Sequence, residues 1–287
     1  MTGREFVSRA EHFTRVGSTN DVVRDWLAEG TDEVCIATAY EQTAGRGREG
    51  RSWVAPAGRA LLASLGFRPT WLAPGATWRL AASVALAMAE AAEEHAGLAA
   101  GTVWLKWPND LVLGGPPDEP DVRKLAGVLG ETDGLGTGDP RVVIGIGINV
   151  DWPRHDFPAA LANTMTSLRN AAVLRPLGRD VLLEMFLARL EAGLGALRVG
   201  WFAGDAWRDR QVTTGRIVRL LWPDGRREDV LGLGVDVASG GLIIGGLERL
   251  HWPALRDPND ATGERTIHIG EIHHVRLASG IAVTAGV

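Results

Sequence analysis

Gln42-Thr-Ala-Gly-Arg-Gly-Arg-Glu-Gly-Arg-Ser-Trp53 interleaves three arginines with three glycines in one short segment. Glycine lets backbone N–H groups approach a ligand closely, and arginine offers a planar fork of donors that suits carboxylate and phosphate. The pattern predicts an anion-binding loop, which we expect to order when the anion arrives. A solvated turn with scattered charge is the alternative, and the matching segments elsewhere in the chain argue against it.

The composition is that of an ordinary globular protein with one large domain, or a medium domain and a small one. The 287 residues are 45% apolar and 23% charged, and the net charge of -5 argues against a general nucleic-acid binder. The lone Cys35 lies in an apolar run and is interpreted as a core residue. The N-terminus has no apolar signal core, the longest apolar run (residues 80–89) is too short to cross a bilayer, and too few residues precede position 15 for a DNA-binding domain. We therefore expect a soluble cytoplasmic protein that binds neither DNA nor a membrane.

Apolar periodicity predicts strands and helices without regular βαβ alternation, which favours an α+β fold. Helices are expected after the capping residues Ser18-Thr-Asn-Asp21, over residues 80–95 and over residues 180–199. Strands are expected over residues 34–39, 60–67, 103–107, 124–131 and 141–150. Short strands at residues 216–221, 242–244 and 272–277, separated by turn signals, predict a small β-barrel. We place a boundary near residues 208–213, which gives domains of residues 1–210 and 211–287.

Four segments carry the candidate chemistry. They are Gly17-Ser-Thr-Asn20, the segment 42–53, Leu105-Lys-Trp-Pro-Asn-Asp110, and Lys124-Leu-Ala-Gly127 with Gly145-Ile-Gly-Ile-Asn149. Each is weak to moderate alone, whereas all four in this order are strongly specific. On these residues the chain resembles the biotin protein ligases, in the short form without an N-terminal DNA-binding domain. The resemblance spans roughly residues 13 to 277 and is strongest through residue 150.

The resemblance implies a mixed-sheet catalytic domain followed by a small SH3-like barrel. It also implies a two-step reaction with ATP, biotin and Mg²⁺ as cofactors and substrates. Biotin and ATP give biotinyl-5′-AMP and pyrophosphate, and the acyl group then passes to a lysine of a biotin carboxyl carrier protein. Joining a carboxylate to a phosphate brings two anions together, and the cations of the motifs would offset their repulsion. Sheet-edge homodimers occur in the family, but no residue of this chain decides its oligomeric state.

Residue roles follow from the positions that match the family's motifs. The implied catalytic residues are Arg48, Lys106, Asp110 and Lys124. The implied biotin contacts are Ser18, Thr19, Gln42, Gly45, Arg46, Arg48, Lys124, Gly127 and Gly147. The implied ATP and adenylate contacts are Arg46, Arg51, Trp53, Lys106, Asn109 and Asn149. Trp53 is expected to stack on adenine, and the glycines at 127, 145 and 147 to let the thiophene ring approach the sheet. No residue is implied as a metal ligand, because Mg²⁺ is inferred from ATP alone.

Several of these roles have a plainer alternative that the sequence leaves open. Ser18 and Thr19 are helix-capping residue types, and tryptophan is a common core residue. Pro108-Asn-Asp110 is also a turn sequence, and Lys124 could be a surface lysine at a strand end.

The sequence departs from the family pattern in places. Glu49 stands where many members carry a second basic residue, which lowers the local positive charge. Residues 114–123 make a longer, more acidic loop than usual, and residues 252–265 are interpreted as a surface loop. Near the C-terminus, Glu271 and Arg276 are weak candidates for facing the active site, and His273 and His274 are interpreted as strand residues and not as metal ligands.

Other functions stay open at this stage. A lipoate ligase-type acyltransferase is one, although the arginine–glycine segment with Lys106-Trp-Pro-Asn109 fits biotin better. A non-enzymatic biotin or biotinyl-AMP binding protein is another, and the acidic net charge argues against a DNA-binding repressor of that kind. A degenerate ligand-binding relative is supported by Glu49 alone.

Overall fold

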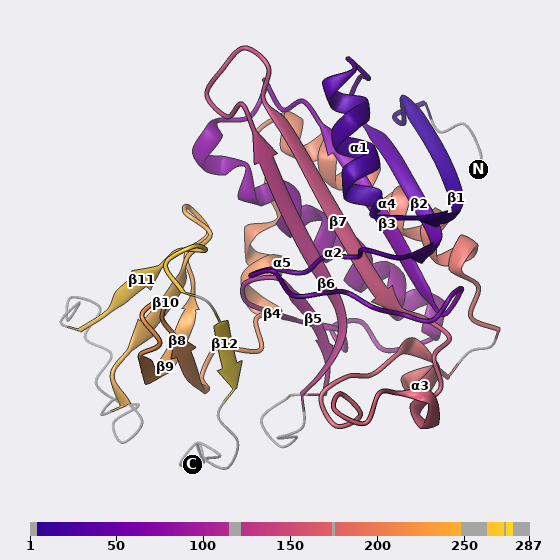
Figure 1. Cartoon of the computed structure of the whole chain (residues 1–287). Helices are drawn as coiled ribbons and strands as arrows, with labels where there is room; N and C mark the ends of the chain where they lie inside the picture. The colour runs from indigo at the N-terminus through magenta and orange to yellow at the C-terminus, as the bar shows by residue number, and fades with distance from the viewer. Residues whose placement is uncertain (1–4, 115–121, 174–175, 248–262, 273, 278–287) are drawn as a thin grey trace.

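The chain folds around two β-sheets that lie side by side (Figure 1). The computed structural model describes residues 5–114, 122–173, 176–247, 263–272 and 274–277. The predicted loops at 114–123 and 252–265 fall mostly outside these residues, and His273 falls outside them entirely. None of the helices in these ranges has both the length and the apolar character that crossing a bilayer requires.

The larger sheet has seven strands in the order β1-β2-β3-β7-β6-β5-β4. Its strands are β1 (Arg9–Val16), β2 (Cys35–Gln42), β3 (Ala60–Phe67), β4 (Trp104–Lys106), β5 (Asp110–Leu113), β6 (Arg123–Asp133) and β7 (Arg141–Asn149). β1 runs parallel to β2, and all other neighbours are antiparallel. The mixed sheet with helices confirms the predicted α+β class.

Helices cover both faces of this sheet (Figure 1). The helix α1 (Thr19–Ala28) packs Val23 and Leu27 against one face, next to Cys35. On the other face lie α2 (Trp78–Ala96) and α4 (Arg179–Arg198), which pack on each other, with α2 over β6 and β7 and α4 over β3. Successive strand residues point to opposite faces, so β3, which is buried along its whole length, contributes to both layers. Burial raises the pKa of the Cys35 thiol to about 11, as expected for a core residue.

Several short elements were not expected from the sequence. They are the 3-10 turns Pro74–Ala76 and Arg154–Asp156 and the helices α3 (Leu168–Ala171) and α5 (Gly204–Asp209). The helix α2 ends where Gly97 adopts a left-handed conformation (φ 67°), a stop that suits glycine because it has no Cβ.

The smaller sheet is antiparallel, with strands in the order β11-β10-β9-β8-β12. They are β8 (Ile217–Leu221), β9 (Arg227–Val235), β10 (Leu242–Gly245), β11 (Arg265–Ile267) and β12 (His274–Leu277). Where the sequence predicted a small SH3-like barrel, the structure has a five-stranded antiparallel sheet. Among the residues that the structure describes, no pairing of β11 with β12 closes it.

The two sheets are joined by specific contacts and by one continuous apolar cluster. Trp107 Nε1 donates to the Gly240 carbonyl at 3.0 Å. The Glu93 carboxylate accepts from Arg210 at 2.6 and 3.1 Å and from the Val103 amide at 2.8 Å. A domain boundary near residues 208–213 stays a proposal. The contacts between the two sheets fix where β12 lies relative to the large sheet.

Candidate active site

The strand register brings a row of functional residues onto one face of the large sheet. Lys106 on β4 pairs with Asp110 on β5, Asp110 pairs with Gly127 on β6, and Gly127 pairs with Gly147 on β7. Paired residues in a sheet point to the same side, so this row presents two charged side chains followed by two glycines. The glycines make a shallow trough, and the charged pair closes one end of it.

A β-bulge adds Lys124 to this row. Leu111 pairs with Ala126 but Val112 pairs with Lys124, so β6 has one more residue than β5 at this point. Residues three apart on a regular strand face opposite sides, and an extra residue restores the same side. Lys124 Nζ consequently lies 2.6 Å from Asp110 Oδ1 and beside Gly127. The motif was enough to predict that Lys124 belongs to the site. The bulge that directs its side chain to this face could not be predicted from the sequence.

Asp110 therefore lies between two ammonium groups. Lys106 Nζ is 3.6 Å from its Oδ2, and the side chains of Lys106 and Asp110 are only 14% and 13% exposed. Burial raises the pKa of Asp110, but Lys124 and Lys106 lower it by more, so that its pKa lies below the usual range. Burial lowers the pKa of Lys106, and Lys124 adds to that effect while Asp110 opposes it. The cluster carries a net positive charge suited to an anion.

The opposite end of the trough is polar and uncharged. The Thr19 amide and hydroxyl donate to Gln42 Oε1 at 2.7 and 3.0 Å, and Thr19 Oγ1 lies 2.6 Å from Ser64 Oγ. Ser64 Oγ lies 2.6 Å from Asn20 Oδ1. Ser18 occupies the N-cap position of α1 but makes no side-chain cap bond. Capping hydrogen bonds therefore do not account for Ser18 and Thr19, and Ser64 and Asn20 are site residues that the predicted set lacked.

The segment 45–53, which we call the strap, is a tight hairpin. Gly47 N donates to Arg51 O at 2.6 Å, Arg51 N to Arg48 O at 3.2 Å and Trp53 N to Gly45 O at 2.9 Å. Glu49 and Gly50 at its tip both have positive φ (57° and 66°), which is the signature of a type I′ turn. The glycine at the second position suits this turn, and glutamate at the first is strained there.

The strap carries Trp53 into the trough. A Cβ on Gly147 would come within 2.5 Å of Trp53 Cε2, and one on Gly127 within 3.3 Å of Trp53 Cζ3. Lys124 Nζ lies 5.5 Å from the centre of the indole ring. The absence of a Cβ at these two positions therefore accommodates an indole in the protein itself, where the sequence predicted a ligand ring. The Trp53 Nε1 is buried without a partner.

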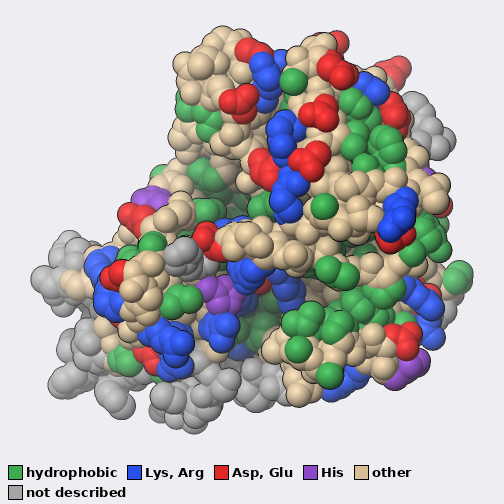
Figure 2. All heavy atoms as spheres, in the orientation of Figure 1, with side chains coloured by type: hydrophobic (Ala, Val, Ile, Leu, Met, Phe, Trp, Pro, Cys, Tyr) green, Lys and Arg blue, Asp and Glu red, His purple; other side chains and the backbone are tan. Residues whose placement is uncertain are grey.

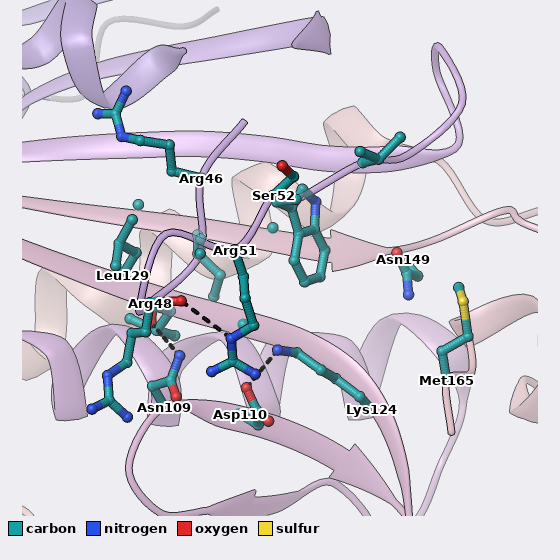
Figure 3. A pocket seen from close by; sticks show the side chains of 18 of the residues that line it. Arg46, Arg48, Arg51, Ser52, Asn109, Asp110, Lys124, Leu129, Asn149 and Met165 are labelled. Atoms are coloured by element: carbon teal, nitrogen blue, oxygen red, sulfur yellow. Dashed lines mark hydrogen bonds and ion pairs between the residues drawn. The ribbon is translucent and has the colours of Figure 1, made fainter. Parts of the chain in front are cut away.

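Arg46 differs from the other strap arginines. Figure 3 shows its side chain pointing away from the group formed by Arg48, Arg51, Asp110 and Lys124. Its guanidinium makes two 2.8 Å bonds to Asp21 and a 3.2 Å bond to Glu131. These bonds lower the pKa of Asp21, with the hydrogen bond from Arg46 as the largest cause. While this network is intact, the Arg46 side chain is held away from the ligand, and the backbone of Arg46 is the part that can make the predicted ligand contact.

The two asparagines predicted to contact the nucleotide donate hydrogen bonds to backbone carbonyls. Asn109 Nδ2 donates to Val128 O and Asn149 Nδ2 to Thr166 O, both at 2.9 Å. In Figure 3, Asn149 and Met165 lie at the far side of the pocket from Arg48. Both amide orientations are fixed, which leaves each side-chain oxygen as the free acceptor.

A cavity of about 710 Å³ unites these parts. Figure 2 shows Lys and Arg side chains gathered around a hollow between the two sheets. Of the predicted site residues, Gly45 alone does not line the cavity; the space where its Cβ would lie is taken by the Trp53 carbonyl. The strand β12 adds His274 and Arg276 to the cavity lining, whereas Glu271, the other weak candidate near the C-terminus, is not among the lining residues. The sequence interpreted His274 as a strand residue, which is right, but did not place it in the cavity.

The chemistry of this cavity is that of an anion clamp beside a neutral recognition site. Burial, followed by Lys106, Arg51 and Arg276, lowers the pKa of His274 to about 4, so its imidazole is neutral at pH 7. Burial also lowers the pKa of Arg48, although a guanidinium keeps its charge. In the part of the chain that the structure describes, no cluster of three acidic, histidine or cysteine side chains could hold a metal ion.

Comparisons with known proteins agree on one family. The Biotin/lipoate A/B protein ligase family matches residues 12–149. The chain is 32% identical to the biotin–[acetyl-CoA-carboxylase] ligase of Mycobacterium tuberculosis over 242 residues, which is 81% of this chain and 82% of that protein. It is 37% identical to the bifunctional ligase/repressor BirA of Escherichia coli over 233 residues, or 80% of this chain and 66% of that protein.

A solved structure shares the fold. The biotin protein ligase from Aquifex aeolicus, in complex with biotin and ATP, superposes with a TM-score of 0.72 at 24% identity and covers 94% of this chain and 99% of its own. At that identity the likeness establishes the arrangement of the two sheets and no residue role.

Proposed function

The chain belongs to the biotin protein ligases, and we propose that it attaches biotin to a lysine of a biotin carboxyl carrier protein through biotinyl-5′-AMP, at the cost of ATP. The observation that carries the proposal is the Lys106–Asp110–Lys124 cluster at one end of the trough. In the first step a biotin carboxylate oxygen bonds to the α-phosphorus of ATP and pyrophosphate leaves. In the second, the acceptor ammonium loses a proton to water, the resulting amine bonds to the acyl carbon, AMP leaves, and the amide nitrogen releases a second proton.

The lysine cluster supports the first step electrostatically. Two anions must meet, and preorganised positive charge in a partly buried site stabilises the charge that develops on the phosphate. Lys124 on β6 lies next to the glycine trough, and Lys106 on β4 lies two strands further toward the edge of the sheet. We assign Lys124 to the carboxylate and α-phosphate and Lys106 to the outer phosphates.

Asp110 serves the second step in this proposal. Phosphate oxygens compete with Asp110 for the two lysines, which frees its carboxylate for the incoming ammonium of the acceptor. Because its pKa is lowered, Asp110 is ionised at pH 7 and suited to hold that ammonium. A second cavity of about 420 Å³ shares Lys106, Asn109 and Asp110 with the first, and we take it as the approach of the acceptor lysine.

The strap closes over the ligands. Arg48 and Arg51 lie on its underside, with Arg48 only 10% exposed. Trp53 leaves the glycine trough when biotin enters it and supplies the face on which adenine stacks. Closing the site protects the mixed anhydride, which water would otherwise hydrolyse. Asn149 and Asn109 offer acceptors to the nucleotide.

Mg²⁺ enters this proposal with the nucleotide. Asp110, the carboxylate at the phosphate end, has one oxygen 2.6 Å from Lys124 and the other 3.6 Å from Lys106. Mg²⁺ is commonly held by substrate phosphates with one or two carboxylates, and the described residues do not form a cage of their own for it. We therefore treat magnesium–ATP as the substrate and assign the ion no protein ligand.

Lipoate ligation is the second candidate, and the polar end of the trough argues against it. A dithiolane ring has no hydrogen-bonding group to offer the buried Thr19 and Asn20 or the half-buried Gln42, and a site built to hydrogen-bond its ligand rejects such a ring strongly. A purely binding function is disfavoured by the lysine pair, which biotin alone would not need. The proposal keeps the reaction in the cytoplasm, where ATP is abundant. The lack of DNA binding stays a prediction, and no residue decides whether the chain forms a homodimer.

The proposal is tested by incubating the protein with ATP, Mg²⁺, biotin and a biotin carboxyl carrier domain, read by intact mass. We expect one biotinyl group on the carrier, and none when ATP is omitted. Lipoate in place of biotin should leave the carrier unmodified. An unmodified carrier with all components present, or equal transfer of lipoate, would overturn the proposal.

A further inference from the structure

Four charged side chains form a closed ring beside the strap. We call this ring the anchor, and its members are Asp21, Arg24, Arg46 and Glu131. The Arg46 guanidinium makes two bonds of 2.8 Å to Asp21 and one of 3.2 Å to Glu131. Arg24 completes the ring, because its Nη2 donates to Asp21 Oδ1 at 2.6 Å and to Glu131 Oε2 at 2.9 Å. Each carboxylate therefore contacts both guanidiniums, and the charges alternate around the ring.

The anchor joins the strap to two other elements. Asp21 lies in the first turn of α1 with Arg24 one turn further on, and Glu131 lies near the end of β6. The backbone bonds within the strap hold the hairpin together, whereas the Arg46 side chain reaches out of it (Figure 3). Arg46 therefore ties the hairpin to a helix and to a strand of the large sheet.

The anchor has the two features that make exposed ion pairs effective. An isolated pair at the surface contributes little to stability, because water and salt screen it. All four side chains of the anchor are partly exposed, but the Arg46–Asp21 pair is bidentate and the four charges form a network. Contacts of this strength hold the strap in place and still release it. Release is needed in the proposed function, because Trp53 of the strap fills the glycine trough that biotin enters.

We infer that Asp21 and Glu131 are positioning residues that hold the strap down through Arg46 and thereby set the rate at which a bound ligand leaves. Arg46 lines the cavity, whereas Asp21, Arg24 and Glu131 line neither of the two cavities. These three residues therefore act on the ligand only through the strap. When the strap lifts, two carboxylates face the single guanidinium of Arg24, and the excess negative charge draws Arg46 back.

Arg24 gives the inference a prediction of opposite sign. Its guanidinium contacts the same two carboxylates as Arg46, so it competes with the strap for them. Arg24→Gln leaves Arg46 as the one positive charge of the anchor, and the strap should then lift less often. If the four residues served only to fasten α1 to β6, the loss of Arg24 would loosen this region as the loss of any other member does.

Hydrogen exchange of the ligand-free protein measures how often the strap lifts. A detached two-stranded hairpin is marginally stable in water, so the amides of residues 45–53 exchange once the strap leaves the trough. Arg46→Gln should speed this exchange about 10-fold, and Asp21→Asn and Glu131→Gln about 3-fold each, as the loss of networked ion pairs does. The double variant of Arg46→Gln and Glu131→Gln should exchange no faster than Arg46→Gln alone, because Glu131 acts through Arg46. Arg24→Gln should slow the exchange.

Asp229→Asn is the matched control. Asp229 holds Arg219 on the small sheet by two bonds of 2.6 Å, and neither residue lines a cavity. Its loss should leave the exchange of the strap unchanged. High salt should speed this exchange in the unaltered protein and in the control but not in Arg46→Gln, because salt screens the anchor. Thermal unfolding of each variant checks that the fold is intact.

Two readouts separate the inference from the proposed function. Additive effects of Arg46→Gln and Glu131→Gln on exchange would overturn the inference, and so would faster exchange in Arg24→Gln or equal exchange in all the proteins. The link to ligand release rests on the proposed function and is read from the loss of labelled biotinyl-AMP during a chase with unlabelled adenylate. Release should follow the order of the exchange rates, and release that is the same in all the variants would overturn the link. If the unaltered protein forms no biotinyl-AMP from biotin and magnesium–ATP, the proposed function fails, while the exchange data still decide whether the anchor holds the strap.

Discussion

Asp110 holds two ammonium groups close to the floor of the trough, one from a paired strand and one aimed by a bulge. These are the side chains of Lys106 and Lys124, the only lysines in the sequence. In the proposed function, a protein that acylates lysines keeps its own two beside its reaction centre. The point charges act as a pair, so the loss of either should be felt mainly in the step where phosphate charge develops.

Lys124→Ala should lower kcat/KM for biotin-dependent pyrophosphate exchange by about 10²–10³-fold, as the loss of one preorganised charge does elsewhere. Lys124→Arg retains the charge but not the compact ammonium, and should recover part of the rate. Turnover close to that of the unaltered protein in Lys124→Ala would remove this residue from the mechanism.

His274 should make the protein less stable in mild acid. Its pKa in the folded state is about 4, lowered by burial and then by Lys106, Arg51 and Arg276, with Asp110 opposing. The unfolded chain therefore takes up this proton near pH 6.5 while the folded chain does not until pH is near 4. The stability contribution is fully present above pH 6.5 and is lost between pH 6.5 and 4.

Urea unfolding at several pH values tests this against His274→Gln. After allowance for solvent screening, the unaltered protein should lose about 1–2 kcal/mol more than the variant over that window. Parallel stability curves for the two proteins would show that His274 does not stay neutral in the fold.

Residue types in motifs were enough to choose residues that line the cavity, because all of the chosen residues except Gly45 do so, but they did not predict the individual contacts. Lys106, Asp110 and Lys124 stand in recognisable segments, so their meeting could be expected. The presence of Ser64 in the cavity could not be expected, because Ser64 lies inside an apolar strand and its position depends on the pairing of that strand with β7. The network that holds Arg46 needs Asp21 and Glu131, which are remote in sequence.

At the scale of elements, strongly periodic segments were predicted well. The strand β3 matches residues 60–67, and the helices α2 and α4 match their predicted ranges within two residues. The strand β1 was missed because it is an edge strand in which charged and polar side chains outnumber the apolar Ala10, Phe13 and Val16, and these three do not alternate regularly. The strand β9 was missed because Gly232 and Gly234 interrupt its apolar pattern, and a bulge against β10 lies beside them.

The strap hairpin should close more firmly when its first turn residue is changed. Glu49 adopts a left-handed conformation (φ 57°), which costs a non-glycine residue roughly 1 kcal/mol or more. Glu49→Asn suits the type I′ turn and also removes a negative charge, so it should slow the release of biotinyl-AMP several-fold. Glu49→Gln removes the charge alone and is the matched control.

A chase of labelled biotinyl-AMP with unlabelled adenylate measures these rates. Slower release in Glu49→Asn than in Glu49→Gln assigns the difference to the turn, and slower release in both assigns it to the charge. Release at the rate of the unaltered protein in both variants would show that the strap does not control retention.

At the scale of the whole molecule, the small sheet completes the lining of the candidate site. Its strand β12 brings Arg276 and His274 to the cavity, although these residues are remote in sequence from the strap. The sequence predicted a separate small β domain and could not show that its core is continuous with that of the large sheet. The placement depends on the contacts between α2, β4 and the segment around residue 210.

The buried pair of Glu93 and Arg210 holds that placement. Their side chains are 5% and 15% exposed, and Glu93→Gln should leave the guanidinium buried without its counter-charge. Removing one partner of such a pair costs about 3–5 kcal/mol, which urea unfolding would detect. Glu90→Gln on the same helix, whose partner Arg189 lies 3.9 Å away at the surface, should cost less than about 1 kcal/mol. Equal losses in the two variants would contradict the structural role of Glu93.

Because Lys106 and Lys124 are the two lysines of the chain, the rate at which lysines react with an amine-specific reagent reports directly on this cluster. The protein is treated with a reagent specific for amines, alone or with biotin and a non-hydrolysable ATP analogue, and its peptides are mapped by mass. Lys124, which is 35% exposed, should label slowly in the free protein, and Lys106, at 14%, more slowly still. Both should be protected when the two ligands are bound together, and labelling beforehand should abolish pyrophosphate exchange. Labelling of both lysines at the same rate with and without ligands would contradict a clamp in which they hold the carboxylate and the phosphates.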